Sequence, residues 1–133
     1  MSTTKVPLEA DEQIGFVNWC HVKGIPVHHS SNEIGGSTPA MKARALKMKK
    51  MGTSKGFPDL LVLVPIRGID GSVDCYQMLA IEMKRRRGST TTIEQKQWLS
   101  ILELAGIPAR VCKGADEAIK FVQEYLQEPE FAI

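Results

Sequence analysis

The chain has 133 residues, of which 43% are hydrophobic and 24% charged, with a formal net charge of +2. This composition is ordinary for a soluble globular protein, and no apolar stretch approaches the roughly 20 residues of a membrane span. Residues 1–5 do not lead into a signal-peptide core. We therefore expect one domain over residues 1–133, with its core at about 8–126.

The cysteines indicate the redox compartment of the protein, and the charge distribution indicates the kind of ligand it binds. Cys20, Cys75 and Cys112 are odd in number and far apart, which favours free thiols in a reducing cytoplasm over zinc or disulfides. Residues 42–96 hold 12 of the 17 Lys and Arg residues but only 5 of the 15 acids. Such a concentration of positive charge suits an anionic polymer such as nucleic acid, although a solvated basic surface would give the same counts.

The first expected element is a helix over residues 8–23 that ends at Gly24 and Pro26. Glu9 and Gln13 are four apart and share a face, so either could look toward a metal site. Taken alone, these positions are better explained by the favourable placement of acids in the first turn of a helix. A short strand over residues 27–30 and a polar loop follow. We interpret His28 and His29 as structural or phosphate-contacting residues, because neighbours on a strand face opposite ways.

Residues 39–51 predict a basic helix, with Met41, Ala45 and Met48 as its apolar stripe. A glycine-rich loop over residues 52–56 then leads directly to Pro58 and Asp59. A run of charge is usually a solvated face. Because this one leads to a carboxylate, we favour contact with nucleic-acid phosphates.

Two apolar runs, residues 56–64 and 79–84, predict neighbouring strands. The Asp70-Gly71 dipeptide between them predicts an antiparallel hairpin. Asp59 would then converge with Glu82 and Lys84, whose side chains share one face. Two carboxylates and an ammonium could hold a hard cation and cleave a phosphodiester, or could simply be a turn Asp and a solvated Glu-Lys pair.

The last third of the chain predicts a helix, a strand and a helix. A hydroxyl of residues 89–92 should cap a helix over 93–105, ended by Gly106, with Gln95 and Lys96 in its first turn. Its expected buried residues are Trp98, Leu99, Leu102 and Leu104. A strand over 108–112 and a helix over 116–127 follow. The order of elements predicts the α/β class, with a mixed β-sheet flanked by helices.

The motifs together resemble a known family. Pro58-Asp59, 22 further residues and Glu82-Met83-Lys84 match the signature of the PD-(D/E)XK nuclease superfamily. Over about residues 8–126 the chain resembles a stand-alone phage or bacterial VRR-Nuc domain, the virus-type replication-repair nuclease. The matching segments are Glu9-x-x-x-Gln13 with Trp19, residues 29–33, Met51-Gly52, residues 56–60, Ile81-Glu82-Met83-Lys84, Glu94-Gln95-x-x-Trp98-Leu99 and Leu104-Ala105-Gly106.

The resemblance implies a restriction-endonuclease-like core and metal-dependent cleavage. Asp59, Glu82 and the Met83 backbone carbonyl would ligate Mg²⁺ or Mn²⁺, which suit an all-oxygen site. Lys84 would position or help deprotonate the attacking water, and Gln95 would orient that water or Lys84. Glu9 would complete the site directly or through a water, with Glu12 as the weaker alternative. The basic residues expected at DNA are Lys42, Arg44, Lys47, Lys49, Lys50, Lys55, Arg85, Arg86, Arg87 and Lys96.

The resemblance also implies a substrate class and a partner. Relatives of this kind resemble virus-encoded, structure-specific endodeoxyribonucleases, often homodimers that resolve four-way (Holliday) junctions in DNA recombination and repair. We therefore expect a homodimer acting on branched DNA in the cytoplasm of a bacterial host cell, with the gene in a phage or mobile element. Two alternatives stay open: a nuclease for flaps or other branched or duplex DNA, and a replication accessory that binds DNA without cutting. Candidate dimer contacts are the helix near residues 89–104 and residues 131–133.

Overall fold

The computed structural model describes residues 5–30 and 36–126 of the chain. The motif residues 31–33 and the candidate contact at 131–133 lie outside these ranges. The elements in chain order are α1 (Glu9–Lys23), β1 (Val27–His29), α2 (Pro39–Lys50), β2 (Leu60–Arg67), β3 (Val73–Lys84), α3 (Ile93–Leu104), β4 (Ala109–Lys113) and α4 (Ala115–Gln123). The described helices include none that is both long and apolar enough to cross a membrane.

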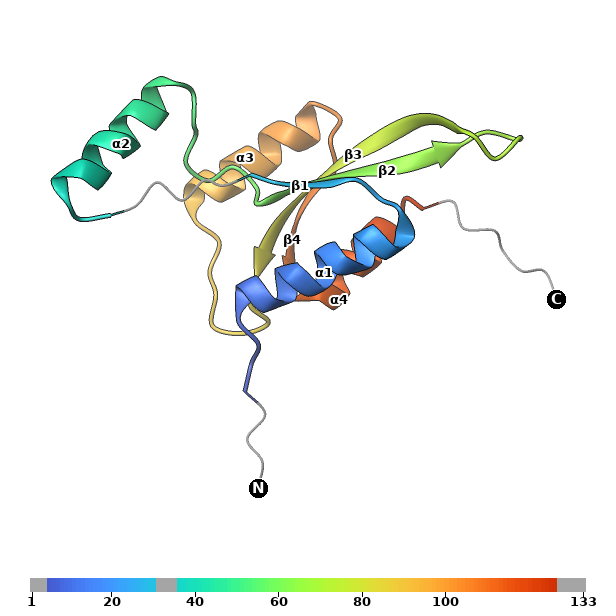
Figure 1. Cartoon of the computed structure of the whole chain (residues 1–133), viewed down its shortest axis with the longest axis horizontal. Coiled ribbons are helices and arrows are strands. Elements are labelled where there is room, and N and C mark those ends of the chain that lie inside the picture. The colour runs from blue at the N-terminus through green and yellow to red at the C-terminus, as the bar shows by residue number, and fades with distance from the viewer. Residues whose placement is uncertain (1–4, 31–35, 127–133) are drawn as a thin grey trace.

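The strands form one mixed sheet in the order β1-β2-β3-β4. β1 and β2 are antiparallel, as are β2 and β3, whereas β3 and β4 are parallel. Helices α1 and α4 lie side by side against one face of the sheet, and α3 covers the other (Figure 1). The predicted α/β fold with a mixed sheet between helices is confirmed.

The core lies between the sheet and the α1/α4 layer. Strand alternation sends every second residue of β2 and β3 to this side, where they meet Phe16, Cys20, Phe121 and Val122 of the helices. The buried strand residues are Leu60, Val62, Val64, Leu79, Ile81 and Met83. Because these side chains occupy one face, the alternate residues Asp59, Glu82 and Lys84 fall on the opposite face, toward α3.

The expected burial of α3 was only partly correct. Leu102 is buried and Trp98 and Leu99 are half-buried, whereas Leu104 is 91% exposed. Residues two apart on a helix point in nearly opposite directions, so only one of this pair can face the sheet. On α1, Phe16 and Cys20 are buried one turn apart, while the apolar residues Ile14 and Val22 point to solvent.

The hairpin strand β3 is longer than the apolar run alone predicted. It begins at Val73, and its first residues pair with β2 beyond the ends of β1 and β4. The Asp70 side chain accepts hydrogen bonds from the Ser72 amide (3.0 Å) and hydroxyl (2.7 Å) in the turn, and Gly71 takes a positive φ of 82°. The turn chemistry extends the ladder through residues that are exposed, so hydrophobicity could not mark where the strand starts.

Helix α2 projects from the body of the protein and contains no buried residue (Figure 1). Thr38 caps it by accepting a hydrogen bond from the Met41 amide (3.1 Å). Its predicted apolar stripe is not covered, since Met41 is 47% exposed and Ala45 and Met48 are half-buried. The helix therefore presents its basic residues to solvent.

Candidate active site

The two carboxylates come together through the strand register. Leu60 pairs with Ile81, so Asp59 lies opposite Glu82 at the end of the β2–β3 ladder. The Asp59 Oδ2 atom accepts a hydrogen bond of 2.9 Å from the Met83 amide, which orients its carboxylate along the edge of the sheet. The sequence expectation that Asp59 and Glu82 converge thus agrees with the geometry.

The loop before Asp59 is pinned against α3. Gly56 has a φ of +86°, and a Cβ on it would lie 2.7 Å from the Glu94 backbone carbon. Phe57 packs edge-on against Trp98 of α3, with ring centroids 5.1 Å apart. The close backbone approach and the aromatic contact together set the position of Asp59 relative to α3.

Lys84 and Gln95 converge on one oxygen of Glu82. Lys84 Nζ lies 3.5 Å from Glu82 Oε1, and the Gln95 Nε2 atom donates to the same oxygen at 2.6 Å. The Gln95 Oε1 atom accepts from the Thr92 amide (2.9 Å) in a capping box, so only Nε2 is left to face Glu82. The helix cap therefore sets the orientation of a side chain in the site. Gln95 and Lys84 therefore share Glu82 Oε1 as their partner, and the predicted role of Gln95 in orienting the water or Lys84 stays a prediction.

The site is short of positive charge. Burial is the main cause that raises the pKa of Glu82 to about 7, and repulsion by Asp59 adds to it, with Lys84 opposing both. Burial also raises the pKa of Asp59, against the Met83 amide and the charges of Lys84 and His29. Glu82 Oε2 is buried and has no hydrogen-bond partner among the described residues. One ammonium does not compensate two adjacent carboxylates, of which Glu82 is buried and Asp59 half-buried.

The donor set fits a divalent cation. Within residues 5–30 and 36–126, no group of three or more His, Cys, Asp and Glu side chains is arranged to hold a metal. The unpartnered Glu82 Oε2 and the Asp59 carboxylate nevertheless supply two anionic oxygens at one point. The N–H and C=O of one strand residue point to the same side, so the Met83 carbonyl is directed toward the Asp59 side as well. An all-oxygen set of this kind suits Mg²⁺ or Mn²⁺.

Helix α1 carries both candidate acids, and Glu12 is engaged away from this site. The charge of Glu9 adds the last and smallest contribution to the raised pKa of Glu82, after burial and Asp59. Glu12 is buried and forms an ion pair with Arg86, whose Nε lies 3.0 Å from Glu12 Oε1. Sequence spacing left both acids open, and the pairing of Glu12 distinguishes them.

His29 and Gln13 extend the site on the β1 side. His29 Nδ1 lies 3.1 Å from the Asp59 carbonyl oxygen, and Gln13 Nε2 lies 3.1 Å from the same nitrogen. With the proton on Nδ1 the ring donates to the Asp59 carbonyl, and with Nδ1 unprotonated it accepts from the Gln13 amide, so the tautomer decides which of the two contacts is a hydrogen bond. Either contact fits the structural reading of His29. Sequence reasoning left open that Gln13 could look toward a metal site but did not connect it with His29, because β1 and α1 meet only in the folded protein.

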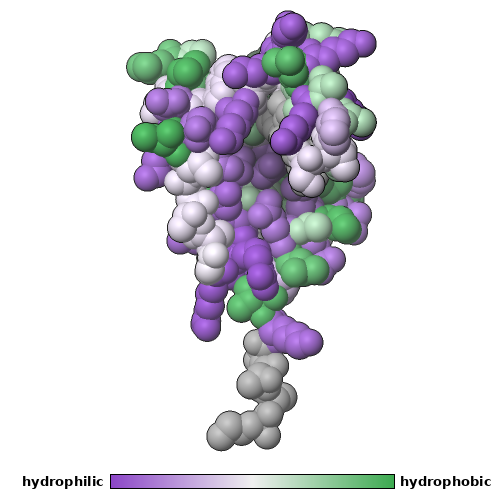
Figure 2. Space-filling view, turned by 90° about the vertical axis from the view of Figure 1, so that its left-hand side faces the viewer, coloured by the Kyte–Doolittle hydropathy of each residue, from purple (hydrophilic) through white to green (hydrophobic). Residues whose placement is uncertain are grey.

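The basic residues expected at DNA fall into two groups. Those of α2 are exposed on the projecting helix, on a side of the molecule that is largely hydrophilic (Figure 2). Lys55 lies 3.8 Å from Glu94, while Lys96 and Arg87 are exposed near the start of α3. Arg85 and Arg86 are different, because both make hydrogen bonds within the protein, to residues 6, 7, 12 and 116.

Comparison with known proteins agrees with these observations. The family model described as the VRR-NUC domain matches residues 6–116. A solved structure described as a VRR_NUC domain protein is 31% identical, covers 93% of this chain and 92% of its own, and has a TM-score of 0.69. No curated protein sequence matched significantly. The chain therefore belongs to the VRR-Nuc domain family, a family of nucleases of the PD-(D/E)XK type.

Proposed function

We propose that the protein is a Mg²⁺- or Mn²⁺-dependent endonuclease that hydrolyses phosphodiester bonds in branched DNA, with four-way junctions as its preferred substrate. The observation that carries the chemistry is the pairing of half-buried Asp59 with buried Glu82 beside the Lys84 ammonium, with one glutamate oxygen unpartnered among the described residues. Binding alone would not require two adjacent carboxylates near DNA phosphates, since they repel the ligand.

Asp59, Glu82 and the Met83 carbonyl would hold the cation. When bound, such a cation polarises the phosphoryl oxygen and lowers the pKa of water. Gln95 and Lys84 both engage Glu82 Oε1, which fixes the carboxylate and leaves Oε2 for another partner. The Lys84 ammonium, largely buried at 12% exposure, orients the attacking water and offsets the negative charge that develops on the phosphate. Glu9 extends the anionic side of the site.

Helix α2 supports recognition of the DNA backbone. Five of its residues are basic, none is buried, and the loop after it leads to Asp59. Such a surface contacts phosphates and reads shape without reading sequence. These features favour a substrate defined by its branched geometry.

Removing two charges from α2 tests this surface. The Lys47→Gln/Lys50→Gln variant is expected to weaken DNA binding and to reduce the slope of log K against log salt by about 2, because each lost phosphate contact contributes about 1. Cleavage at saturating enzyme should be unchanged. The matched control Lys23→Gln/Lys120→Gln removes the same charge from α1 and α4 and should leave the slope unaltered. Equal slopes for both variants would exclude α2 as the DNA surface.

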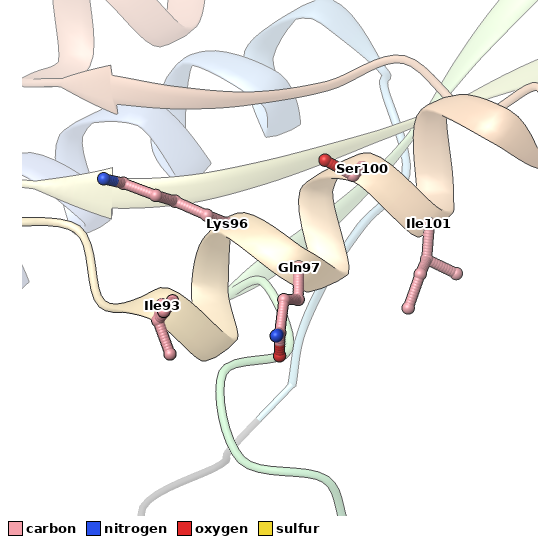
Figure 3. Close-up of a pocket in the computed structure, with 5 residues that line it drawn as sticks. All are labelled: Ile93, Lys96, Gln97, Ser100 and Ile101. Atoms are coloured by element: carbon pink, nitrogen blue, oxygen red, sulfur yellow. The ribbon is translucent and has the colours of Figure 1, made fainter.

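The outer face of α3 is the surface we assign to the homodimer contact. Ile93, Gln97 and Ile101 project from one side of the helix beside an open depression of about 410 Å³ (Figure 3). Ile93 is 69% and Ile101 53% exposed, and Leu104 continues the apolar surface at the end of the helix. A two-fold axis through one patch buries the same residues on both copies, and it also relates two active sites as paired junction cuts require.

An Ile101→Glu substitution tests the assignment. It is expected to shift the protein from dimer to monomer in analytical ultracentrifugation, because the axis would place a buried charge on each side of the contact. Ile14→Glu on α1, a residue 58% exposed, is the matched control and should remain dimeric. A dimeric Ile101→Glu variant would place the contact elsewhere.

The decisive experiment for the function is cleavage of labelled DNAs of defined shape. A four-way junction, a flap and a linear duplex of shared sequence are incubated with Mg²⁺ or Mn²⁺, with Asp59→Asn as the inactive control. Paired symmetric cuts on the junction, absent in the control, are the expected result. Equal cutting of flap or duplex DNA would retain the nuclease and refute the junction preference. Binding without any cutting would favour the replication accessory.

A further inference from the structure

Arg86 joins three elements at the end of β3. Its Nε donates to Glu12 of α1 at 3.0 Å, and its Nη2 lies 3.3 Å from Asp116 at the start of α4. Glu12 is only 6% exposed and also accepts the Ala115 amide. That amide is the first cause, and Arg86 the second, of the lowered pKa of Glu12. The hydrogen bond is charge-assisted, and Glu12 is shielded from solvent. Loss of the arginine would therefore leave a buried carboxylate without its positive partner.

The same junction holds the backbone of Lys84. Gly114 donates its amide to the Lys84 carbonyl at 3.0 Å. A Cβ at Gly114 would lie 2.9 Å from Arg86 Nε and 3.1 Å from Glu12 Oε2, and the residue has a φ of +92°. Glycine is thus required where the arginine packs. Gly114 therefore contacts both the Arg86–Glu12 pair and the backbone of Lys84.

Arg85 secures the chain on the other side of Glu9. Its Nη2 donates to the Val6 carbonyl at 3.0 Å and its Nε to the Pro7 carbonyl at 3.3 Å. These carbonyls come just before Glu9, and Glu12 follows Glu9 by three residues, one turn of α1. The two arginines therefore hold the chain on both sides of Glu9, whose charge acts on Glu82.

We propose that Arg85 and Arg86 are positioning residues that fix the first turn of α1, so that Glu9 is held at the Asp59–Glu82 site. The proposal rests on the proposed function of that site. It differs from the expectation that these arginines contact DNA, since both guanidinium groups make hydrogen bonds within the protein, although 46% of the Arg86 side chain is exposed. Arg87, the third residue of the run, is exposed and retains its expected role at phosphates.

The test compares Arg86→Gln with the wild type in three measurements: Mn²⁺ affinity by calorimetry, single-turnover cleavage and DNA affinity. Substitution of a residue that orients a metal ligand without touching the metal typically changes metal affinity or activity 10- to 100-fold. We expect about tenfold weaker Mn²⁺ binding and slower cleavage, with DNA affinity unchanged. Arg110→Gln is the matched control, since it removes the Arg110–Glu124 pair (3.1 Å) between β4 and the end of α4. It should alter neither Mn²⁺ binding nor cleavage.

The effect must pass through Glu9. In a Glu9→Gln background, Arg86→Gln is expected to cause no further loss, because the group that it positions is already missing. Arg86→Lys keeps one charged donor for Glu12 and should recover part of the affinity. It also serves as the variant of choice if Arg86→Gln fails to fold. Fully additive losses from Glu9→Gln and Arg86→Gln, or reduced DNA affinity with normal Mn²⁺ binding, would overturn the proposal.

The outcomes separate this proposal from the nuclease itself. Wild-type protein that binds Mn²⁺ but cuts no DNA refutes the proposed function, and the non-additive loss of Mn²⁺ affinity would still support the positioning role. Wild-type protein that cuts DNA with unchanged Arg86→Gln kinetics supports the nuclease and overturns the positioning role. Wild-type protein that binds no Mn²⁺ overturns both.

Discussion

Replacing Glu82 with glutamine is expected to abolish cleavage and, at the same time, to make the metal-free protein more stable at pH 8. Glutamine keeps the shape of the side chain but removes one of two anionic oxygen ligands. We expect a loss of about 10³-fold or more in single-turnover rate, equivalent to about 4 kcal/mol in the barrier. DNA binding in EDTA should be retained, because the substitution removes a negative charge.

The stability gain follows from the raised pKa of Glu82. The native carboxyl has a pKa of about 7, against an ordinary value of 4.5, mainly because it is buried. The folded state therefore binds this proton more tightly than the unfolded state, and stability falls as pH rises from about 4.5 to 7. The free energy of unfolding falls by roughly 3 kcal/mol over that range, and this loss stays constant at higher pH. Glutamine does not ionise, so the variant avoids this loss.

Urea unfolding in EDTA at pH 5 and pH 8 measures the effect. Lys84 loses its anionic partner in the variant, so the net gain at pH 8 is expected to be about 1–2 kcal/mol, with little difference at pH 5. Added Mg²⁺ should stabilise the wild type and not the variant, because ligand binding favours the folded state. A Glu82→Gln protein that is less stable at pH 8 would mean that Glu82 is already compensated without a metal.

Replacing Lys84 with methionine is expected to separate cation binding from cleavage. Methionine keeps the apolar stem of a side chain that is only 12% exposed and removes the ammonium 3.5 Å from Glu82. Because the proposed role of Lys84 is to orient the water and to offset charge on the phosphate, cleavage should fall about 10²- to 10⁴-fold. Mn²⁺ should bind at least as tightly as in the wild type, since a repelling positive charge is gone.

Lys113 offers the matched control for this substitution. It pairs with Lys84 in the β3–β4 ladder but lies exposed on the neighbouring strand. Lys113→Met removes the same charge at the same level of the sheet and should cut at the wild-type rate. If Lys84→Met instead lost Mn²⁺ affinity in proportion to its cleavage, the lysine would be acting on the cation site and not on the water.

Much of the fold was determined by local chemistry that the sequence displays directly. Alternation along a strand put Glu82 and Lys84 on one face, and the Asp70-Gly71 turn made the hairpin that carries Asp59 to Glu82. Thr92 and Gln95 have the spacing of a capping box, which set the start of α3. These features depend on residues close in sequence or joined by one tight turn. Family membership followed from the same motifs and was confirmed.

Only the tertiary structure decided how α1 and the arginine run meet the sheet. Glu9 and Glu12 are one turn apart, and the choice between them depends on a partner, Arg86, that lies 74 residues away from Glu12. The same holds for Arg85 and Arg86, which look like phosphate contacts in sequence and bond to the protein itself in the fold. Local spacing states which side chains share a face. Which charged partner such a face meets depends on how α1 and α4 pack on the sheet. The burial of Phe16, Phe121 and their neighbours fixes this packing.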